Sequence, residues 1–239
     1  MNENNLEHLL DNAQKKFRVG FEPVKINNTV LNILQIQNLD EYLETLADKS
    51  SGTDPLELPF WAKIWPASIL LAYSLDRLTE PGDPHKQTVL ELGAGTGLCG
   101  LYTAALGFAT TITDNNKDAL LFARINALKN DLASRVKVDY ADMGKTVLDT
   151  GFDYILGSEI LYIQDLNRAL VKFISRHLNP GGRVILSADY KRQSKKFFNL
   201  AAEEFDISHK TIGYKEKNSQ GKQERFLCSI YTLTRKRDD

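Results

Sequence analysis

The chain has 239 residues, of which 42% are hydrophobic and 26% are charged, and its formal net charge is -1. This length suits one sizeable α/β domain, and the composition is ordinary for a soluble globular protein. A protein that binds nucleic acids through its overall charge is strongly basic, and this chain is nearly neutral. We therefore expect no nucleic-acid partner.

The cysteines and the N-terminus bear on the cellular compartment. The two cysteines, Cys99 and Cys228, match neither a zinc spacing nor a disulfide framework, so we expect a reducing compartment and no metal. Residues 1–14 are polar and lack the apolar stretch of a secretory signal. No apolar run approaches the roughly 20 residues needed to cross a bilayer. These features predict a cytoplasmic protein that does not enter a membrane.

The first 55 residues differ in pattern from the rest. Two short runs of β-forming residues, 17–21 and Thr29–Ile36, are separated by an Asn-Asn turn signal. A short helix is expected over residues 39–47. We therefore expect residues 1–55 to form an extension, a β-hairpin and a short helix, that packs on a main domain of residues 56–239.

Predicted strands and helices alternate through most of the remaining chain. The strands are expected at Thr88–Leu92, 110–113, 136–138, 154–157, 183–188 and 226–233. The helices are expected from Pro66 onward and at 97–106, Lys117–Lys129, 164–178 and 194–204. Segment 179–182 should end a helix, and the polar segment 215–225 should be a hairpin loop. This alternation predicts an α/β fold with a doubly wound, mostly parallel sheet and an antiparallel last strand.

A glycine-rich loop follows the first strand of this alternation. Gly93, Ala94, Gly95 and Gly97 stand between a buried strand and a helix, where glycine permits a tight turn and close approach of a ligand. The free N–H groups and the positive dipole at the helix start favour an anionic group. Leu98 stands where the dinucleotide fingerprint has its third Gly or Ala, which argues against NAD.

Acidic and aromatic residues follow the next strands. Asp114 ends the second strand, where a carboxylate either accepts hydrogen bonds from ribose hydroxyls or caps the following helix. Glu159 and Tyr162 follow the fourth strand. Because ligands bind outside the carboxyl ends of parallel strands, both side chains should face the ligand. The alternatives are a helix cap for Glu159 and a half-buried core aromatic for Tyr162.

These motifs together resemble methyltransferase family 16, a seven-strand class I S-adenosylmethionine-dependent family that contains many protein-lysine methyltransferases. The matching features are Trp61 and Trp65 in LPFWAKIWPAS, the Glu91-x-Gly-x-Gly-x-Gly loop, Asp114, and Glu159-x-x-Tyr162. The resemblance covers residues 55–235 and implies a Rossmann-like, seven-stranded fold with S-adenosyl-L-methionine as cofactor.

The resemblance also implies roles for individual residues. The glycine loop would hold the methionine part of the cofactor, and Asp114 its ribose. Asp142, beside Met143, would contact the adenine, although an Asp after a strand is otherwise a turn residue and several relatives carry Trp after this acid. The implied cofactor-binding set is Trp65, Glu91, Gly93, Ala94, Gly95, Gly97, Asp114, Asn115, Asp142, Met143 and Ser158.

On the acceptor side, the resemblance implies that Glu159 and Tyr162 are catalytic and contact a lysine amine of a protein substrate. The alternatives are a small-molecule or RNA acceptor, and a cofactor-binding module without catalysis. Trp65 would contact the cofactor or the acceptor channel, unless it is a core tryptophan. The basic group Lys191, Arg192, Lys195 and Lys196 is interpreted as solvated surface, with docking of an acidic protein or RNA as its alternative.

Overall fold

The computed structural model describes residues 5–39, 41–44, 59–79, 83–161, 166–192, 194–217 and 223–236. Its main sheet contains β3 (Thr88–Leu92), β4 (Ala109–Asp114), β5 (Val136–Tyr140), β6 (Phe152–Ser158), β7 (Leu178–Asp189), β8 (Phe205–Lys217) and β9 (Gln223–Arg235). The strand order is β5-β4-β3-β6-β7-β9-β8, and β9 runs in the direction opposite to the other six strands. This topology confirms the predicted seven-stranded, mostly parallel sheet.

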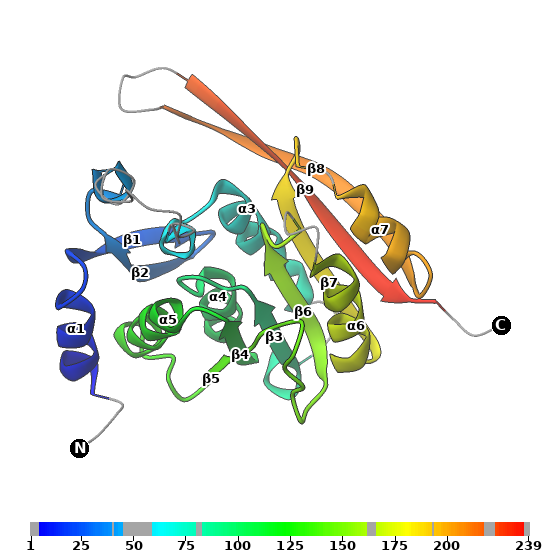
Figure 1. Cartoon of the computed structure of the whole chain (residues 1–239), viewed down its shortest axis with the longest axis horizontal. Coiled ribbons are helices and arrows are strands. Elements are labelled where there is room, and N and C mark those ends of the chain that lie inside the picture. Colours follow the sequence, from blue (N-terminus) through cyan, green and yellow to red (C-terminus); the bar gives the residue numbers. More distant parts are fainter. Residues whose placement is uncertain are drawn as a thin grey trace, which may run out of the picture.

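Helices cover both faces of this sheet (Figure 1). On one face lie α3 (Pro66–Ser74), α4 (Leu98–Ala105) and α5 (Lys117–Lys129), and on the other lie α6 (Asn167–His177) and α7 (Lys195–Ala201). The chain adds β4 and β5 on one side of β3 and then returns to add β6 on the other. This reversal is a topological switch point, where doubly wound sheets open a crevice for ligands.

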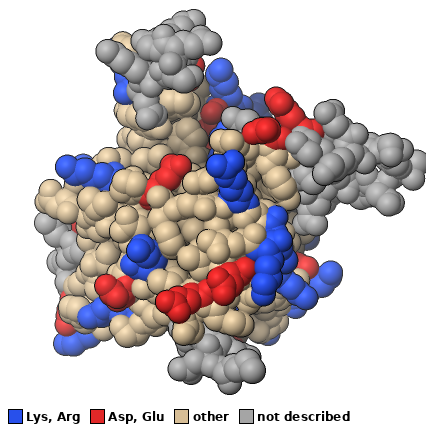
Figure 2. Space-filling view, turned by 90° about the vertical axis from the view of Figure 1, so that its left-hand side faces the viewer, with Lys and Arg blue, Asp and Glu red and all other residues tan. Residues whose placement is uncertain are grey.

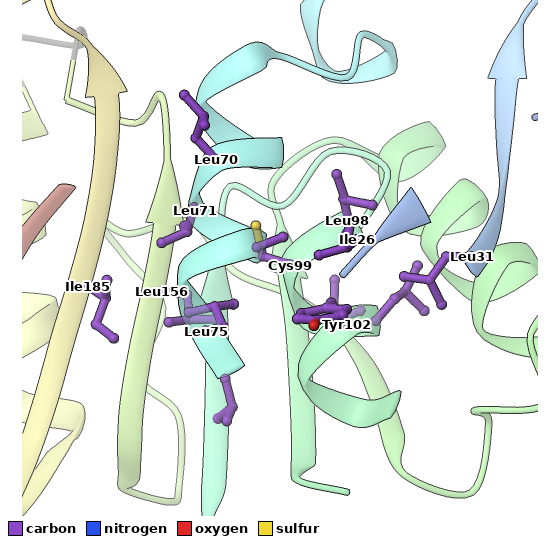
Figure 3. Close-up of a cluster of buried hydrophobic side chains, with 14 of the residues drawn as sticks. Ile26, Leu31, Leu70, Leu71, Leu75, Leu98, Cys99, Tyr102, Leu156 and Ile185 are labelled. Atoms are coloured by element: carbon purple, nitrogen blue, oxygen red, sulfur yellow. The ribbon is translucent and has the colours of Figure 1, made fainter. Parts of the chain in front are cut away.

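The first apolar core fixes the helix that follows the glycine loop. Leu71 of α3 and Leu75, which directly follows α3, pack with Cys99 and Tyr102 of α4, and all four are buried against the sheet (Figure 3). Cys99 is therefore a packing residue, and its thiol lies 3.4 Å from the carbonyl oxygen of Ser68. Because α4 is buried so completely, its N-terminus is held firmly at the end of β3.

The N-terminal segment begins with a helix that the sequence analysis did not predict. Helix α1 (Leu6–Gln14) starts at Asn5, whose side chain accepts a hydrogen bond from the backbone N–H of Glu7. The predicted hairpin follows as β1 (Val19–Ile26) and β2 (Thr29–Ile36). Both α1 and β2 pack on α5. Residues 39 and 41–44 of the expected 39–47 helix are helical, and the others lie outside the described residues.

Three predicted boundaries are wrong. Strand β1 continues through Pro23, since a strand with a single partner can leave a proline nitrogen without a hydrogen bond. The preceding helix ends at His177, just before segment 179–182 as expected, but the strand expected at 183–188 begins earlier, because this segment belongs to β7, where the register with β6 shifts. The hairpin loop expected at 215–225 is shorter, because β8 and β9 pair as far as Lys217 and Gln223.

The surface carries charges of both signs. On the face drawn in Figure 2, basic and acidic side chains are interspersed. Within the described ranges, no helix has the length and apolar character to span a bilayer.

Candidate functional site

A cavity of about 580 Å³ opens at the carboxyl ends of β3, β4, β5 and β6, beside the segment that leads into α3. It brings together nearly all of the predicted site residues: Trp65, Glu91, Gly93, Ala94, Gly95, Asp114, Asn115, Asp142, Met143, Ser158 and Glu159. The other two predicted residues are Gly97 and Tyr162. Gly97 is buried at the start of α4, and Tyr162 lies outside the described residues.

The glycine loop lies so close to neighbouring segments that Gly95 has no room for a side chain. Gly95 has a φ of +55°, and a Cβ there would lie 2.5 Å from the carbonyl oxygen of Trp61. The loop is also tied to the neighbouring strand, because the N–H of Ala94 donates to the carbonyl of Thr113 at 3.0 Å. Glycine is therefore needed at position 95 for both its conformation and its closeness to the Trp61 segment.

Glu91 is a buried carboxylate beneath this loop, with only 3% of its surface exposed. Its Oε2 accepts a hydrogen bond of 2.7 Å from the N–H of Gly100, and a Cβ on Gly100 would meet the same oxygen. Burial raises the pKa of Glu91 to about 8, although hydrogen bonds from the backbone of Gly100 and Cys99 oppose the rise. A positively charged ligand in the cavity would favour the ionised form.

Asp114 connects the end of β4 to the glycine loop. Its Oδ2 accepts from the N–H of Gly95 at 2.9 Å, and its Oδ1 accepts from the N–H of Asn116 at 2.9 Å. Burial raises the pKa of Asp114, and these backbone hydrogen bonds lower it in part. The helix-cap alternative is wrong, because the side chain that caps α5 is that of Asn116.

The segment after β5 forms one end of the cavity. The carboxylate of Asp142 accepts from the N–H of Gly144 at 2.8 Å and pairs with Lys145 at 3.4 Å. Asp142 is therefore a turn residue as well as a cavity residue. Met143 lines the cavity and packs against the apolar core between the sheet and helices α6 and α7. This end of the site combines an acid with an apolar surface.

Glu159 stands at the opposite end, after β6. Its backbone has a φ of +55°, a strained value for a residue other than glycine, and its N–H donates to the carbonyl of Ser187 at 2.8 Å. Its Oε1 accepts from the N–H of Asp189 at 2.7 Å, so the carboxylate joins the ends of β6 and β7. The helix-cap alternative is wrong, because the next described helix, α6, begins at Asn167 with Leu166 as its N-cap residue.

The electrostatic surroundings of Glu159 are mixed. Burial raises the pKa of its carboxyl, while the Asp189 N–H bond and the Arg192 guanidinium oppose the rise. Arg192 lies 3.4 Å away, from its Nη1 to Oε2 of Glu159. A single carboxylate oxygen therefore faces a cation at the cavity wall.

Trp65 forms an aromatic wall of the cavity and is not a core residue. Its indole N–H donates to the carbonyl of Phe60 at 3.1 Å. Two cations lie over its ring: Nζ of Lys63 is 5.3 Å and Cζ of Arg192 is 5.7 Å from the ring centroid. The ring therefore offers its face to positive charge.

The sequence analysis missed Phe60, Lys63 and Arg192 as cavity residues. Phe60 directly precedes Trp61, and Lys63 lies between Trp61 and Trp65, so the sequence position of both residues beside these tryptophans could have indicated a place at the cavity. Arg192 follows the carboxyl end of β7, the edge at which ligands bind, but the sequence analysis interpreted it only as part of a solvated basic surface.

Comparison with known proteins decides the family. The lysine methyltransferase family model matches residues 60–204. The chain belongs to this family. It is 34% identical over 138 residues to protein N-lysine methyltransferase METTL21A of Xenopus tropicalis, covering 56% of this chain and 62% of that one. It is 32% identical to the Mus musculus protein of the same name, covering 62% of this chain and 69% of that one.

Other relatives give the same picture. The Danio rerio METTL21A protein is 36% identical, and the match covers 52% of this chain and 58% of the relative. The chain thus spans less than two thirds of the length of the Xenopus tropicalis and Danio rerio proteins. Among solved structures, a putative RNA methyltransferase from Pyrococcus horikoshii has a TM-score of 0.58 at 18% identity, with coverage of 84% and 99%. A glycopeptide N-methyltransferase complexed with sinefungin has a TM-score of 0.52 at 18% identity, with coverage of 70% and 94%. These structures support the fold of the family.

Proposed function

We propose that this chain is an S-adenosyl-L-methionine-dependent methyltransferase that methylates a lysine side chain of a protein. One observation carries the proposal: a single cavity joins the glycine loop and Asp114 to Glu159 and Trp65. The glycine loop and Asp114 suit a cofactor that carries both a nucleoside and a carboxylate. Glu159 and Trp65 suit a basic amine. Family membership and the protein N-lysine methyltransferase activity for which the METTL21A relatives are named support the same function.

The residues on the cofactor side fit this molecule. Glu91 and Asp114 are buried acids whose pKa values are raised by burial, so a ligand with positive charge would stabilise their ionised forms. When bound, the cofactor supplies a methyl group on a sulfonium whose leaving group is a neutral thioether. We assign the methionine part to Glu91 and to the loop of Gly93, Ala94, Gly95 and Gly97, the ribose to Asp114 and Asn115, the adenine to Asp142 and Met143, and the side facing the acceptor to Trp65 and Ser158.

The acceptor side prepares the amine. A lysine ammonium has an unperturbed pKa of about 10.4, so it must lose a proton before its nitrogen can attack. The Glu159 carboxylate accepts a charge-assisted hydrogen bond from the amine and directs the nitrogen lone pair into the cavity. The face of Trp65 attracts the side chain while it is still cationic. The proton passes to water, and a new nitrogen–carbon bond forms as the carbon–sulfur bond breaks.

Positioning accounts for most of the acceleration in this proposal. Effective molarities of well-aligned reactants reach about 10⁵ M or more, and the leaving group needs no acid or metal. Tyr162 is proposed as a second contact of the amine. We also propose that residues 56–239 carry the activity with residues 1–55 as an extension, that no nucleic acid takes part, and that the protein acts in the cytoplasm.

The cofactor is tested by titration calorimetry of the full chain with S-adenosylhomocysteine and, separately, with NAD. We expect binding of the first and none of the second. The acceptor is tested by labelling a cell lysate with tritiated cofactor. A labelled band that survives nuclease and disappears with protease supports a protein acceptor, whereas label lost with nuclease, or label only in small molecules, contradicts it.

The acceptor residues are tested by Glu159→Ala and Tyr162→Phe. We expect kcat to fall in both variants while the affinity for S-adenosylhomocysteine stays near that of the wild type. Phe198→Leu, a conservative change at a residue of α7 that packs against the apolar core, serves as a control for general loss of stability. Unchanged kcat in both acceptor-side variants would contradict the assignment.

A further inference from the structure

Arg192 occupies the position that an acceptor cation would need. Its guanidinium lies 3.4 Å from Glu159 and 5.7 Å from the centroid of the Trp65 ring, and its side chain lines the cavity. A carboxylate oxygen and an aromatic face are the two groups that recognise a basic amine. Arg192 therefore occupies the subsite that, under the proposed function, receives the lysine.

Of the two members of this ion pair, the arginine is the one free to move. The Glu159 side chain is 10% exposed, and Oε1 is fixed by the N–H of Asp189 at 2.7 Å. The Arg192 side chain is 52% exposed, and the residue lies after the end of β7, where its N–H donates to the carbonyl of Asp189. An incoming lysine must therefore displace the guanidinium toward solvent while Glu159 stays in place.

The displaced guanidinium would enter a rim that is already positive. Lys63 lies over the same Trp65 ring, and exposed lysines follow and precede Arg192 in the chain. These lysines are Lys191, Lys195 and Lys196. The nearest acid besides Glu159 is the exposed Asp189, which accepts from the N–H of Lys191 and is outnumbered by the surrounding cations. Farther along the cavity, Asp114 accepts from two backbone N–H groups and Asp142 is paired with Lys145. A carboxylate on the substrate, next to the acceptor lysine, would compensate the displaced charge.

We propose that Arg192 is a specificity-determining residue that selects lysines with an Asp or Glu within about two residues in the substrate protein. This inference rests on the proposed function. The guanidinium exchanges its partner: it leaves Glu159 when the lysine binds there and pairs with the substrate carboxylate at the rim. Lysines with neutral or basic neighbours leave the guanidinium and Lys63 uncompensated and are methylated more slowly.

The test uses the full chain, a cell lysate and S-adenosylmethionine with a trideuterated methyl group, and mass spectrometry locates the labelled lysines. We expect the wild type to label lysines with acidic neighbours preferentially. Arg192→Gln should lower this preference by about three-fold, the size typical of an exposed ion pair. Lys129→Gln is the matched control, because it removes a cation from the face of Phe21, outside the cavity, and should keep the wild-type preference.

Salt gives a second test that needs no variant. Raising the salt from 0.05 to 0.5 M shortens the screening length from roughly 14 to roughly 4 Å, so the wild-type preference for acidic neighbours should fall. Wild-type labelling that ignores neighbouring residues, a preference unaffected by salt, or an unchanged preference in Arg192→Gln would each overturn the inference while leaving the proposed function intact. Label found only in RNA or small molecules, or no label on any lysine, would overturn both.

Discussion

The claim that burial raises the pKa of Glu91 can be tested on the protein without cofactor. Its pKa rises from the ordinary 4.5 to about 8 on folding, so the folded chain takes up a proton between these values. Glutamine at this position keeps the shape and an oxygen for the Gly100 N–H but does not titrate. Because the folded form of the wild type binds more protons, its unfolding free energy should fall as pH rises through this window.

The magnitude follows from the shift. Each pH unit well inside the window contributes about 1.4 kcal/mol. Between pH 5 and pH 7 the unfolding free energy of the wild type should therefore fall by about 2 to 3 kcal/mol relative to that of Glu91→Gln. Urea unfolding followed by the fluorescence of Trp61 and Trp65 measures this difference without cofactor. Glu203→Gln, which changes an exposed carboxylate after α7, should stay parallel to wild type. If Glu91→Gln were also parallel, the carboxyl would be ionised in the folded chain and the burial argument would fail.

Three further substitutions test the contacts that hold the glycine loop in place. Asp114→Asn should weaken S-adenosylhomocysteine binding by about ten-fold or more in calorimetry, because an amide cannot accept both backbone hydrogen bonds that the carboxylate accepts. Gly95→Ala should lower the thermal midpoint and abolish that binding, since its Cβ would meet the Trp61 carbonyl. Asn126→Ala should cost about 1–3 kcal/mol in urea unfolding, because Asn126 is buried and joins the Thr96 carbonyl to the backbone of β2; an unchanged midpoint would refute that role.

The parts of the fold that follow local rules could be predicted from the sequence. Thr88–Leu92 and Lys117–Lys129 have the predicted bounds, because one is an apolar run before glycines and the other has Asn116 as its cap. Helix α1 was missed although its signal is local, because its apolar residues follow the cap Asn5 at helical spacing while the segment was interpreted only as polar; these residues are Leu6, Leu9, Leu10 and Ala13. Strand pairing extended β8 and β9 through polar residues, since ladder hydrogen bonds do not depend on side-chain polarity.

The site residues also fall into those that could be predicted from local sequence and those that could not. The loop around Gly95 and the acid Asp114 could be predicted, because their chemistry is read from the ends of consecutive strands. Arg192 could not be assigned to the cavity, because its contact with Glu159 depends on how β6 and β7 lie side by side. The positive φ of Glu159 also has no local sequence signal. Such contacts between neighbouring strands exist only once the sheet has formed.

The buried acids connect the stability of the free protein to ligand charge. With a pKa of about 8, Glu91 is mostly protonated at neutral pH, and a positive charge in the cavity would lower that pKa and release the proton. S-adenosylmethionine carries a sulfonium that S-adenosylhomocysteine lacks, so its binding at pH 7 should release more protons, up to about one more. Calorimetry in two buffers of different ionisation enthalpy counts these protons, and Glu91→Gln should remove the difference. Equal proton release by the two ligands in the wild type would mean that the sulfonium does not reach the field of Glu91, and the assignment of this residue to the methionine part of the cofactor would be wrong.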